Sequence, residues 1–187
     1  MNLRPLFFLL CLLVVTSCSV TKLNKSVVSA EENSVLYHPK LLNSDSEQLI
    51  IYECNDFVSK ALDIYTIAFI NKNFLGLLDC SIESVVNIHN HAVVDSIFTY
   101  SNPQNKIQIY RAKHNDFVFT FDVTDPKLKL IGNIYTGMKK DIFSKKFNIK
   151  VPLNDIIQIQ NADSTMKFIF YFNNNILKRI DSYIYID

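Results

Sequence analysis

His89 and His91 are the closest pair among the four histidines of the sequence. Two imidazoles can bind one zinc ion when both reach it from the same side. The surrounding pattern predicts a helix, on which residues two apart point about 200° away from each other, so the pair does not suit a shared metal. An extended segment would place both on one face. We predict His89 on the apolar stripe of the helix and His91 in the next loop, with no metal and no cofactor bound.

Catalytic motifs are missing from the sequence. It has no Gly-x-Ser-x-Gly, no His-Glu-x-x-His and only three glycines from which to build a phosphate-binding loop. Asp122 and Asp125 flank a turn that ends at Pro126, where a solvated carboxylate is ordinary turn chemistry. The chain is therefore interpreted as a protein that is not an enzyme.

The N-terminus has the composition of a secretory signal peptide. Arg4 supplies a short positive region, residues 6–15 are all apolar, and Thr16 and Ser17 are small residues before Cys18. An apolar helix of this length covers about half of the ~30 Å hydrocarbon core of a bilayer. Residues 1–17 are therefore predicted to be a cleaved signal and not a membrane span.

Val15-Thr16-Ser17-Cys18 resembles the lipobox of bacterial lipoproteins, in which an aliphatic residue and two small residues precede a cysteine. The resemblance implies cleavage before Cys18, a diacylglyceryl group on its sulfur and an acyl chain such as palmitate on its new amino group. Several acyl chains hold a protein firmly on a membrane. The implied location is the bacterial cell envelope, with the periplasmic side of the outer membrane as the expected site. A plain secreted protein is the alternative.

Cys54 and Cys80 would be the thiols left after removal of Cys11 and lipidation of Cys18. In an exported protein they can form a disulfide, which would close a loop of about 25 residues and stabilise the fold by roughly 3–4 kcal/mol. They can equally be two separately buried thiols that pack as small apolar side chains. The sequence leaves both possibilities open.

The composition, 49% hydrophobic and 20% charged, is that of a globular protein. Residues 18–47, rich in Ser, Lys, Asn and Glu, are predicted to be the lipidated N-terminus and a flexible tether, and residues 48–187 a globular domain. Without Arg4, 18 of the 19 basic residues remain and equal the 18 acidic ones. A neutral chain without a basic cluster is not expected to bind nucleic acid.

Two helices and three strands are predicted in the first part of the domain. Asn55 or Asp56 can cap a helix that reaches Tyr65. Asp79 or Ser81 can cap a second, whose apolar face has helical spacing (Ile82, Val85, Val86 and His89). Period-2 runs predict strands at 96–100, 106–110 and 117–121 and a short extended piece at 128–131.

A similar pattern follows in the second part. It consists of a helix at 138–147 and strands at 156–160, 166–172 and 176–186, with a tight turn at Asn173-Asn174-Asn175. The predicted fold is α+β, with helices packed on one face of an antiparallel sheet. Gly76 and Gly137 each precede a predicted helix, and 137 − 76 = 61 also aligns Ile107 with Phe168 and Ile109 with Phe170. We therefore predict a tandem helix-plus-three-strand repeat, at about 66–126 and 127–187.

The second predicted unit resembles the repeat of β-lactamase-inhibitor-like proteins and the small lipoprotein of the outer-membrane β-barrel assembly machinery. The resemblance rests on Gly137-Met138, the following amphipathic helix and the strands at 168–172 and 176–180. Lys139 stands where that family usually has Ser or Thr. The resemblance implies a three-stranded meander whose sheet recognises other proteins.

Aromatic residues alternate along the predicted strands. Phe117, Phe119 and Phe121 share one face and are expected in the core, as are Phe168, Phe170 and Phe172. A second set is predicted to form a binding surface on the outer sheet face: Tyr110, Ile169, Tyr171, Tyr183 and Tyr185. Alternatively, the two units cover these side chains themselves.

The sequence therefore predicts a membrane-anchored envelope lipoprotein that binds an envelope protein without catalysis, as an assembly accessory or an inhibitor. Its oligomeric state is left open. The alternative is a small-ligand-binding or enzymatic domain with a cone-like curved sheet, of the cystatin or nuclear-transport-factor type, in which the sheet encloses a pocket.

Overall fold

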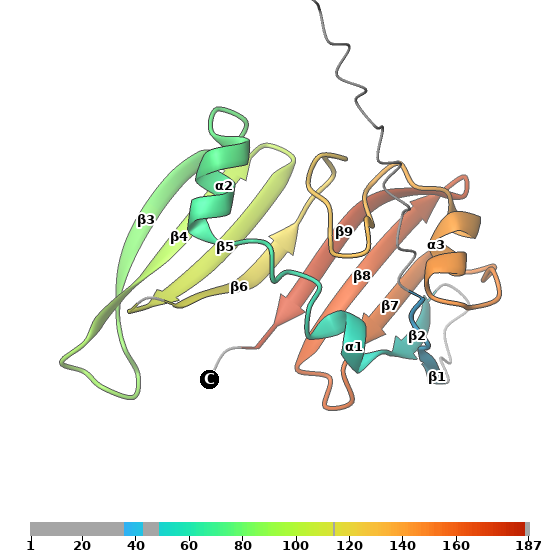
Figure 1. The fold of residues 1–187 in the computed structure, drawn as a ribbon, viewed down its shortest axis with the longest axis horizontal. Coiled ribbons are helices and arrows are strands. Elements are labelled where there is room, and N and C mark those ends of the chain that lie inside the picture. Colours follow the sequence, from blue (N-terminus) through green and yellow to red (C-terminus); the bar gives the residue numbers. More distant parts are fainter. Residues whose placement is uncertain (1–35, 43–48, 114, 186–187) are drawn as a thin grey trace, which may run out of the picture. The chain divides into compact units, whose positions relative to one another are not determined.

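The computed structural model of the chain describes residues 36–42, 49–113 and 115–185, which form one mixed sheet with short helices (Figure 1). The strands are β1 (Lys40–Leu42), β2 (Leu49–Glu53), β3 (Asp79–Val86), β4 (Val94–Asn102), β5 (Asn105–Ala112), β6 (Asn115–Asp122), β7 (Ile156–Gln160), β8 (Met166–Asn173) and β9 (Ile176–Ile184). The helices are α1 (Asn55–Val58), α2 (Ile67–Phe74) and α3 (Lys140–Lys146). The predicted signal peptide, Cys18 and residues 18–35 and 43–47 of the predicted tether lie outside the described residues.

The sheet contains two meanders, the first formed by β3–β6 and the second by β7–β9, and they meet at β6 and β9. The strand order is β1-β2-β7-β8-β9-β6-β5-β4-β3. Every neighbouring pair is antiparallel except β2 and β7, which run parallel from Leu49 opposite Ile156 to Glu53 opposite Gln160. Between β2 and β7 the chain makes the whole first meander, so residues far apart in the sequence pair at the centre of the second half.

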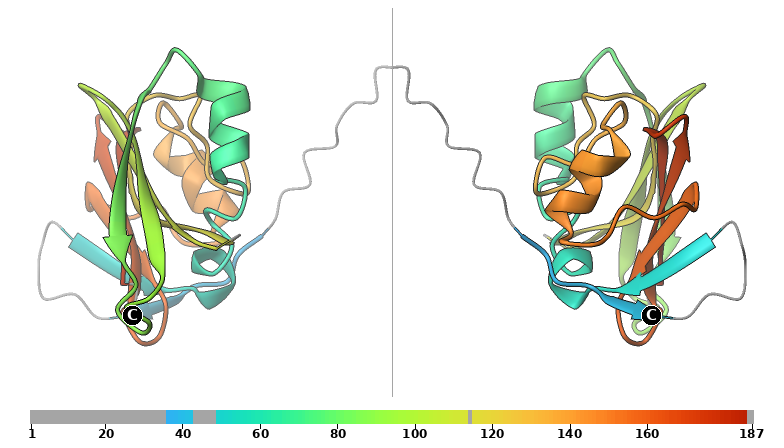
Figure 2. Two further views of the ribbon diagram at one scale, coloured as in Figure 1. Left: turned by 90° about the vertical axis from the view of Figure 1, so that its left-hand side faces the viewer. Right: turned by 90° about the vertical axis from the view of Figure 1, so that its right-hand side faces the viewer.

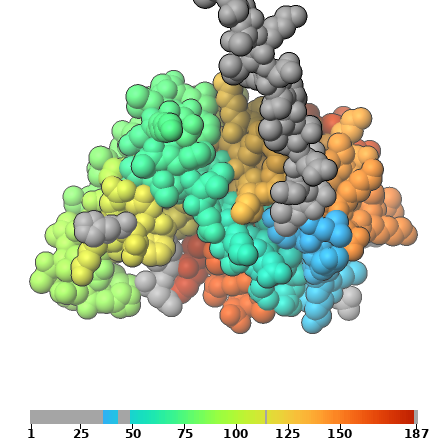
Figure 3. All heavy atoms as spheres, in the orientation of Figure 1, coloured from blue at the N-terminus to red at the C-terminus, as the bar shows by residue number. Residues whose placement is uncertain are grey.

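Figure 2 shows the three helices on one side of the sheet, and its opposite face free of helices. In the space-filling view of the helix side, the segment of α1 and α2 lies across the sheet beside β6 (Figure 3). The Tyr100 side chain of β4 lies on the helix side of the sheet, because its hydroxyl donates to Asn71 Oδ1 of α2 at 2.9 Å. Its partner across the ladder, Ile107, is fully buried. Side chains of opposite parity in these strands therefore face away from the helices.

The predicted α+β fold with an antiparallel sheet is wrong. The protein is mostly β: only 13% of the described residues are helical, and the nine-stranded sheet is mixed. The main error is at Asp79–Val86, where a helix is predicted and strand β3 is found. Ile, Val, Ser, Cys and Asp are poor helix formers, and Ile and Val favour strands. The apolar spacing of this segment also fits a helix, but pairing with β4 over eight residues stabilises the strand instead.

The other predicted elements have mixed outcomes. The six predicted strands are found, although the last one ends at Ile184, and the helix predicted at 138–147 is α3, which spans Lys140–Lys146. The helix predicted from Asn55 to Tyr65 ends at Val58. The sequence pattern did not predict α2, whose N-terminus is capped by the Thr66 hydroxyl, which accepts the Phe69 N–H at 3.1 Å. The piece at 128–131 forms no strand, and its Leu130 makes an isolated antiparallel bridge with Ile134. Asn174 and Asn175 have φ of 50° and 60°, as a two-residue hairpin turn requires.

The predicted repeat of a helix and three strands is also wrong. The offset of 61 residues does relate β5 to β8 and β6 to β9 by their first residues. Gly76 and Gly137 occupy matching turns, with φ of 85° and 95°, in which Leu77 N–H donates to Phe74 O and Met138 N–H to Tyr135 O. After these turns the halves differ, because α3 follows Gly137 whereas strand β3 follows Gly76.

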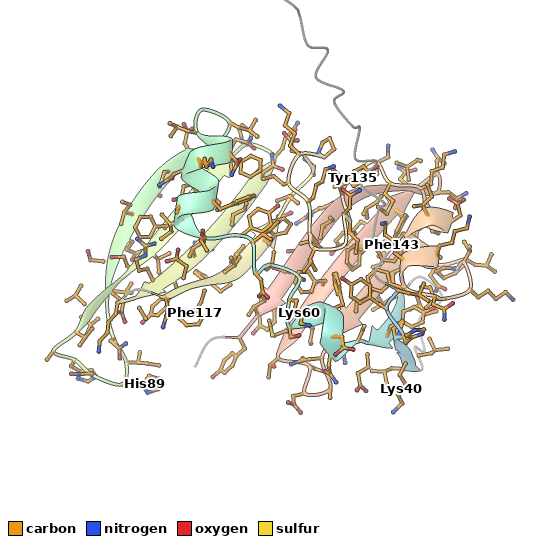
Figure 4. All side chains as sticks on the ribbon, in the orientation of Figure 1. Lys40, Lys60, His89, Phe117, Tyr135 and Phe143 are labelled. Atoms are coloured by element: carbon orange, nitrogen blue, oxygen red, sulfur yellow. The ribbon has the colours of Figure 1, made fainter. Side chains whose placement is uncertain are left out.

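An aromatic cluster fills the space between α3 and the second meander. It consists of Tyr37, Phe57, Phe143, Phe147, Phe168, Phe170 and Phe172. Phe143 points from α3 toward β8 (Figure 4), and its ring centroid lies 4.8 Å from that of Phe170. Tyr37 belongs to the predicted tether but is buried in the cluster, and β1 pairs with β2 directly after it. These rings fix the second half of the sheet beneath α3.

Candidate functional site

An aromatic groove of about 650 Å³ lies on the helix-free face of the first meander. Its lining comes from β3, the β3–β4 loop, β4, β5, β6 and the end of β9: Val85, Val86, Asn87, Ile88, His89, Ile97, Tyr110, Ala112, Phe117, Phe119, Tyr183, Ile184 and Tyr185. Figure 4 shows His89 at the far end of the β3–β4 hairpin and Phe117 near the start of β6. Most of this lining is apolar or aromatic.

The floor of the groove is a row of side chains on neighbouring strands. Ile97 lies opposite Tyr110, and Tyr110 lies opposite Phe117, so the three stand side by side on the helix-free face. Phe117 is 48% exposed, and Tyr183 and Tyr185 are 59% and 58% exposed. Several large aromatic rings exposed together on one face are unusual for a surface that binds nothing.

A β-bulge in β6 produces this arrangement. The register between β5 and β6 shifts at Gln108 and Ile109, because Ile109 faces Val118 while Gln108 faces Thr120. Phe119 is the extra residue, so Phe117 and Phe121 no longer share a face. Phe121 is fully buried under the α1–α2 segment, with its ring 4.9 Å from that of Tyr65. The prediction that Phe117 and Phe119 belong to the core is therefore wrong, since both line the groove.

Asp95, Tyr110 and Asn87 form a polar cluster at the base of the groove. The Tyr110 hydroxyl and the Asn87 amide donate to Asp95 Oδ2 at 2.5 and 2.6 Å. These two hydrogen bonds hold the pKa of the Asp95 carboxyl below its usual value, and the bond to Asp95 raises the pKa of Tyr110. Asp95 is therefore a carboxylate, and Tyr110 a neutral donor, at neutral pH.

The same cluster shapes one wall of the groove. Asn87 Oδ1 accepts the backbone N–H groups of His89 and Asn90, both at 2.9 Å, which folds the chain after β3 into a turn. Because Asn87 is tied to Asp95 and Asp95 to Tyr110, the position of His89 depends on the floor of the groove. This hydrogen-bond network holds one wall of the groove in place, which lowers the entropic cost of binding.

A second cavity, the inner pocket, lies on the helix side. It has a volume of about 400 Å³ and is lined by Val58, Ser59, Leu62, Asp63, Tyr65, Thr66, Asp116, Phe117, Val118, Met166, Ile184 and Tyr185. Asp116 is held there by Arg111, whose Nε and Nη2 donate to its two oxygens at 2.7 and 2.9 Å, and by the Ile67 N–H at 2.9 Å. The carboxylate therefore connects β6 to the first turn of α2.

The predicted binding surface is divided by the structure. Tyr110, Tyr183 and Tyr185 line the groove, whereas Ile169 and Tyr171 lie on β8, outside it. The Arg179 guanidinium lies 5.5 Å from the Tyr171 ring centre and pairs with Asp122 at 2.7 Å, so Tyr171 is covered by an ion pair. Sequence reasoning missed the groove residues of the β3–β4 hairpin because it assigned their segment to a helix. No periodicity in the sequence marks the bulge at Phe119.

The structure gives the positions of the cysteines, histidines and aspartates singled out in the sequence. Cys54 is buried and Cys80 is exposed, and both are free, so no disulfide joins them. Burial raises the pKa of the Cys54 thiol. His89 and His91 lie in the β3–β4 loop, and in the described part of the chain no three metal-ligating side chains gather. Asp122 is paired with Arg179 and is not a free turn carboxylate, whereas Asp125 accepts the Lys127 N–H in a turn.

None of the helices within residues 36–42, 49–113 and 115–185 is long and apolar enough to span a membrane. Comparison of the chain with protein-family models, with curated proteins and with solved structures gave no match.

Proposed function

We propose that this chain is a bacterial envelope lipoprotein, anchored through Cys18, that binds another protein in the aromatic groove without catalysis. The observation that carries the binding proposal is the row of half-exposed rings, Phe117, Tyr183 and Tyr185, around the ordered Tyr110–Asp95 pair. Tyrosine and phenylalanine bury large areas at low entropic cost and are enriched at the centres of protein interfaces. The lipobox supports the location and the outer membrane as the expected membrane.

A second candidate function, binding of a small apolar molecule, is supported by the volume of the groove. About 650 Å³ is within the usual range of ligand pockets. Such pockets enclose most of the surface of their ligand, however. The rings that line this groove are about half exposed to solvent, so the groove is too open to enclose a small molecule in that way. Exposed rings favour a partner that is itself a large surface.

Replacing Cys18 with serine tests the anchor. Serine lacks the thiol that accepts the diacylglyceryl group, so the variant should leave the membrane fraction and be recovered in the soluble fraction of the envelope. Cys80→Ser is the control, since this thiol is exposed and free, and it should fractionate as the natural chain does. Membrane fractionation of the Cys18→Ser chain equal to that of the control contradicts the proposal.

Site-specific photo-crosslinking in the native envelope tests the groove. A photoreactive residue at position 117 should give a discrete protein adduct, while the same residue at Leu153, which is 99% exposed, should not. Tyr183→Asp should reduce the adduct at position 117 about tenfold or more, as loss of an interface aromatic predicts. Ile142→Asp, also at an exposed apolar residue but on α3, should leave it unchanged.

The outcomes separate the two candidate functions. Equal adducts at 117 and 153, or an adduct insensitive to Tyr183→Asp, contradict binding in the groove. An adduct at 117 whose added mass is that of a small molecule or lipid supports the second candidate instead.

A further inference from the structure

The pairing between the two meanders breaks off before it reaches the start of β6. The described residues of β6 and β9 pair at Thr120–Tyr183 and again at the bridge of Val123 and Ile180, whose backbone groups exchange hydrogen bonds of 2.9 and 3.0 Å. Toward the start of β6 the two strands diverge (Figure 1). The bulge at Phe119 accounts for the divergence, because an extra residue bends and twists its strand.

The two edges of this break have partners on their outer sides. Residues 115–118 of β6 pair with β5, and Ile184 of β9 pairs with Met166 of β8. Across the break, no strand pairing joins 115–119 to β9 within the described residues. Within the described residues, the side of β6 that faces away from β5 therefore has no strand partner at 115–118, as at the edge of a sheet.

Cavities lie on both faces of the sheet at this break. The aromatic groove is on the helix-free face and the inner pocket is on the helix face, and the two share Phe117, Ile184 and Tyr185 in their linings. Successive side chains of a β-strand point to opposite faces of its sheet. A strand placed in the break would therefore direct alternate side chains into the groove and into the inner pocket.

We propose that the partner enters this break as an extended segment and pairs with the open edge of β6. This inference rests on the proposed binding function and specifies how the partner is held. Main-chain hydrogen bonds to the residues before the bulge supply affinity. The two cavities bind alternate side chains of the segment and so supply specificity.

The chemistry of the two cavities differs and defines the segment. The lining of the groove contains five Phe and Tyr rings and no Lys, Arg, Asp or Glu, and the Asp95 carboxylate at its base already accepts hydrogen bonds from Tyr110 and Asn87. The groove therefore takes aliphatic or aromatic side chains. The lining of the inner pocket contains Asp63 and Asp116 and no basic residue. Asp116 is already paired with Arg111, whereas Asp63 is exposed. The segment should therefore alternate apolar residues with Lys or Arg.

A short dye-labelled peptide of alternating leucine and lysine is the probe, measured by fluorescence anisotropy against the full chain in detergent. It should bind at least tenfold more tightly than a peptide of the same composition with its leucines and lysines in separate blocks. N-methylation of alternate amides, on the edge that meets β6, should weaken binding about tenfold, because two main-chain hydrogen bonds are lost. N-methylation of the remaining amides should matter less.

A charge reversal tests the inner pocket. Asp63→Lys should weaken binding of the leucine–lysine peptide several-fold and strengthen binding of a leucine–glutamate peptide by a similar factor. The matched control is Asp141→Lys, which places the same charge change at an exposed position on α3. Equal responses of the Asp63 and Asp141 variants would mean that only net charge matters.

The results distinguish this inference from the proposed function. If no alternating peptide binds, or if N-methylation has no effect at either set of amides, strand insertion is wrong. A protein adduct from position 117 would then still support binding in the groove through side chains. If that adduct is also missing, the proposed function fails as well.

Discussion

Phe143→Ala is expected to lower the free energy of unfolding by about 4 kcal/mol, because it removes a large side chain from the core. Phe143 is fully buried, and its ring contacts those of Phe147, Phe170 and Phe172 with centroid separations of 4.7, 4.8 and 5.3 Å. Alanine would leave a cavity at the centre of this cluster. Backbone pairing within β8 and α3 limits how far the neighbours can collapse into it.

Urea unfolding followed by circular dichroism measures this loss, and Ile142→Ala is the matched control. Ile142 is the preceding residue of α3 and is 44% exposed, so its truncation should cost less than about 1 kcal/mol. Both variants change one residue of the same helix to alanine, which keeps helix propensity similar. A loss at Phe143 no greater than that at Ile142 would mean that the aromatic cluster does not hold the second meander.

Asp116→Asn is expected to lower the free energy of unfolding by about 2–3 kcal/mol at pH 7. The Asp116 side chain is 7% exposed, and it accepts two hydrogen bonds from Arg111 and one from the Ile67 N–H. Asparagine has the same shape, but it carries no charge and presents an amide to a guanidinium that can only donate. The variant leaves Arg111 without its counter-ion beside the first turn of α2.

The Asp122→Asn variant is the control for this pair. Arg179 and Asp122 make the same two-point contact at 2.7 Å, but their side chains are 46% and 32% exposed. A surface pair of this kind contributes about 0–1 kcal/mol. If the two variants lose equal stability, burial of Asp116 does not set the strength of its pair.

The effect of Asp116→Asn should depend on pH in a definite direction. Burial alone would raise the pKa of the Asp116 carboxyl, but the hydrogen bonds from Arg111 and the Ile67 N–H outweigh it and hold the pKa below its usual value. A group with a depressed folded-state pKa stabilises the fold above its unfolded pKa, about 3.9 for Asp. That contribution is lost as the pH falls through the folded pKa.

The stability difference between the natural chain and Asp116→Asn should therefore be constant from pH 7 to about pH 5 and shrink below about pH 4. Urea unfolding of both chains at each pH gives this difference, in which the other carboxyl groups cancel. A difference that grows on acidification would contradict the depressed pKa.

Binding in the groove and stability of the core rest on different residues. Phe117 and Tyr183 are exposed and lie on the helix-free face, whereas Phe143 is buried beneath α3. Asp116 is the exception, since it lines the inner pocket and also holds α2. Tests of binding are therefore better made at Asp63 and Tyr183, where a loss of affinity is not a loss of fold.

Local patterns in the sequence were sufficient for features that depend on neighbouring residues. The strands and turn at Met166–Ile184 follow from alternating side chains on both sides of an Asn-Asn pair that tolerates positive φ. The lipobox is likewise local, and it remains a prediction. Tyr110, Tyr183 and Tyr185, which alternation in the sequence assigns to one sheet face, all line the groove.

Tertiary structure decided the features that depend on pairing between distant segments. Asp79–Val86 is a strand because β4 offers it eight partners, although its apolar spacing also suits a helix. The parallel pairing of β2 with β7 joins residues about a hundred positions apart, which no local pattern specifies. The bulge at Phe119 turns Phe117 from the core into the groove and opens the break between β6 and β9. Strand register is set by the summed contacts of both partners, so one strand's sequence cannot determine it.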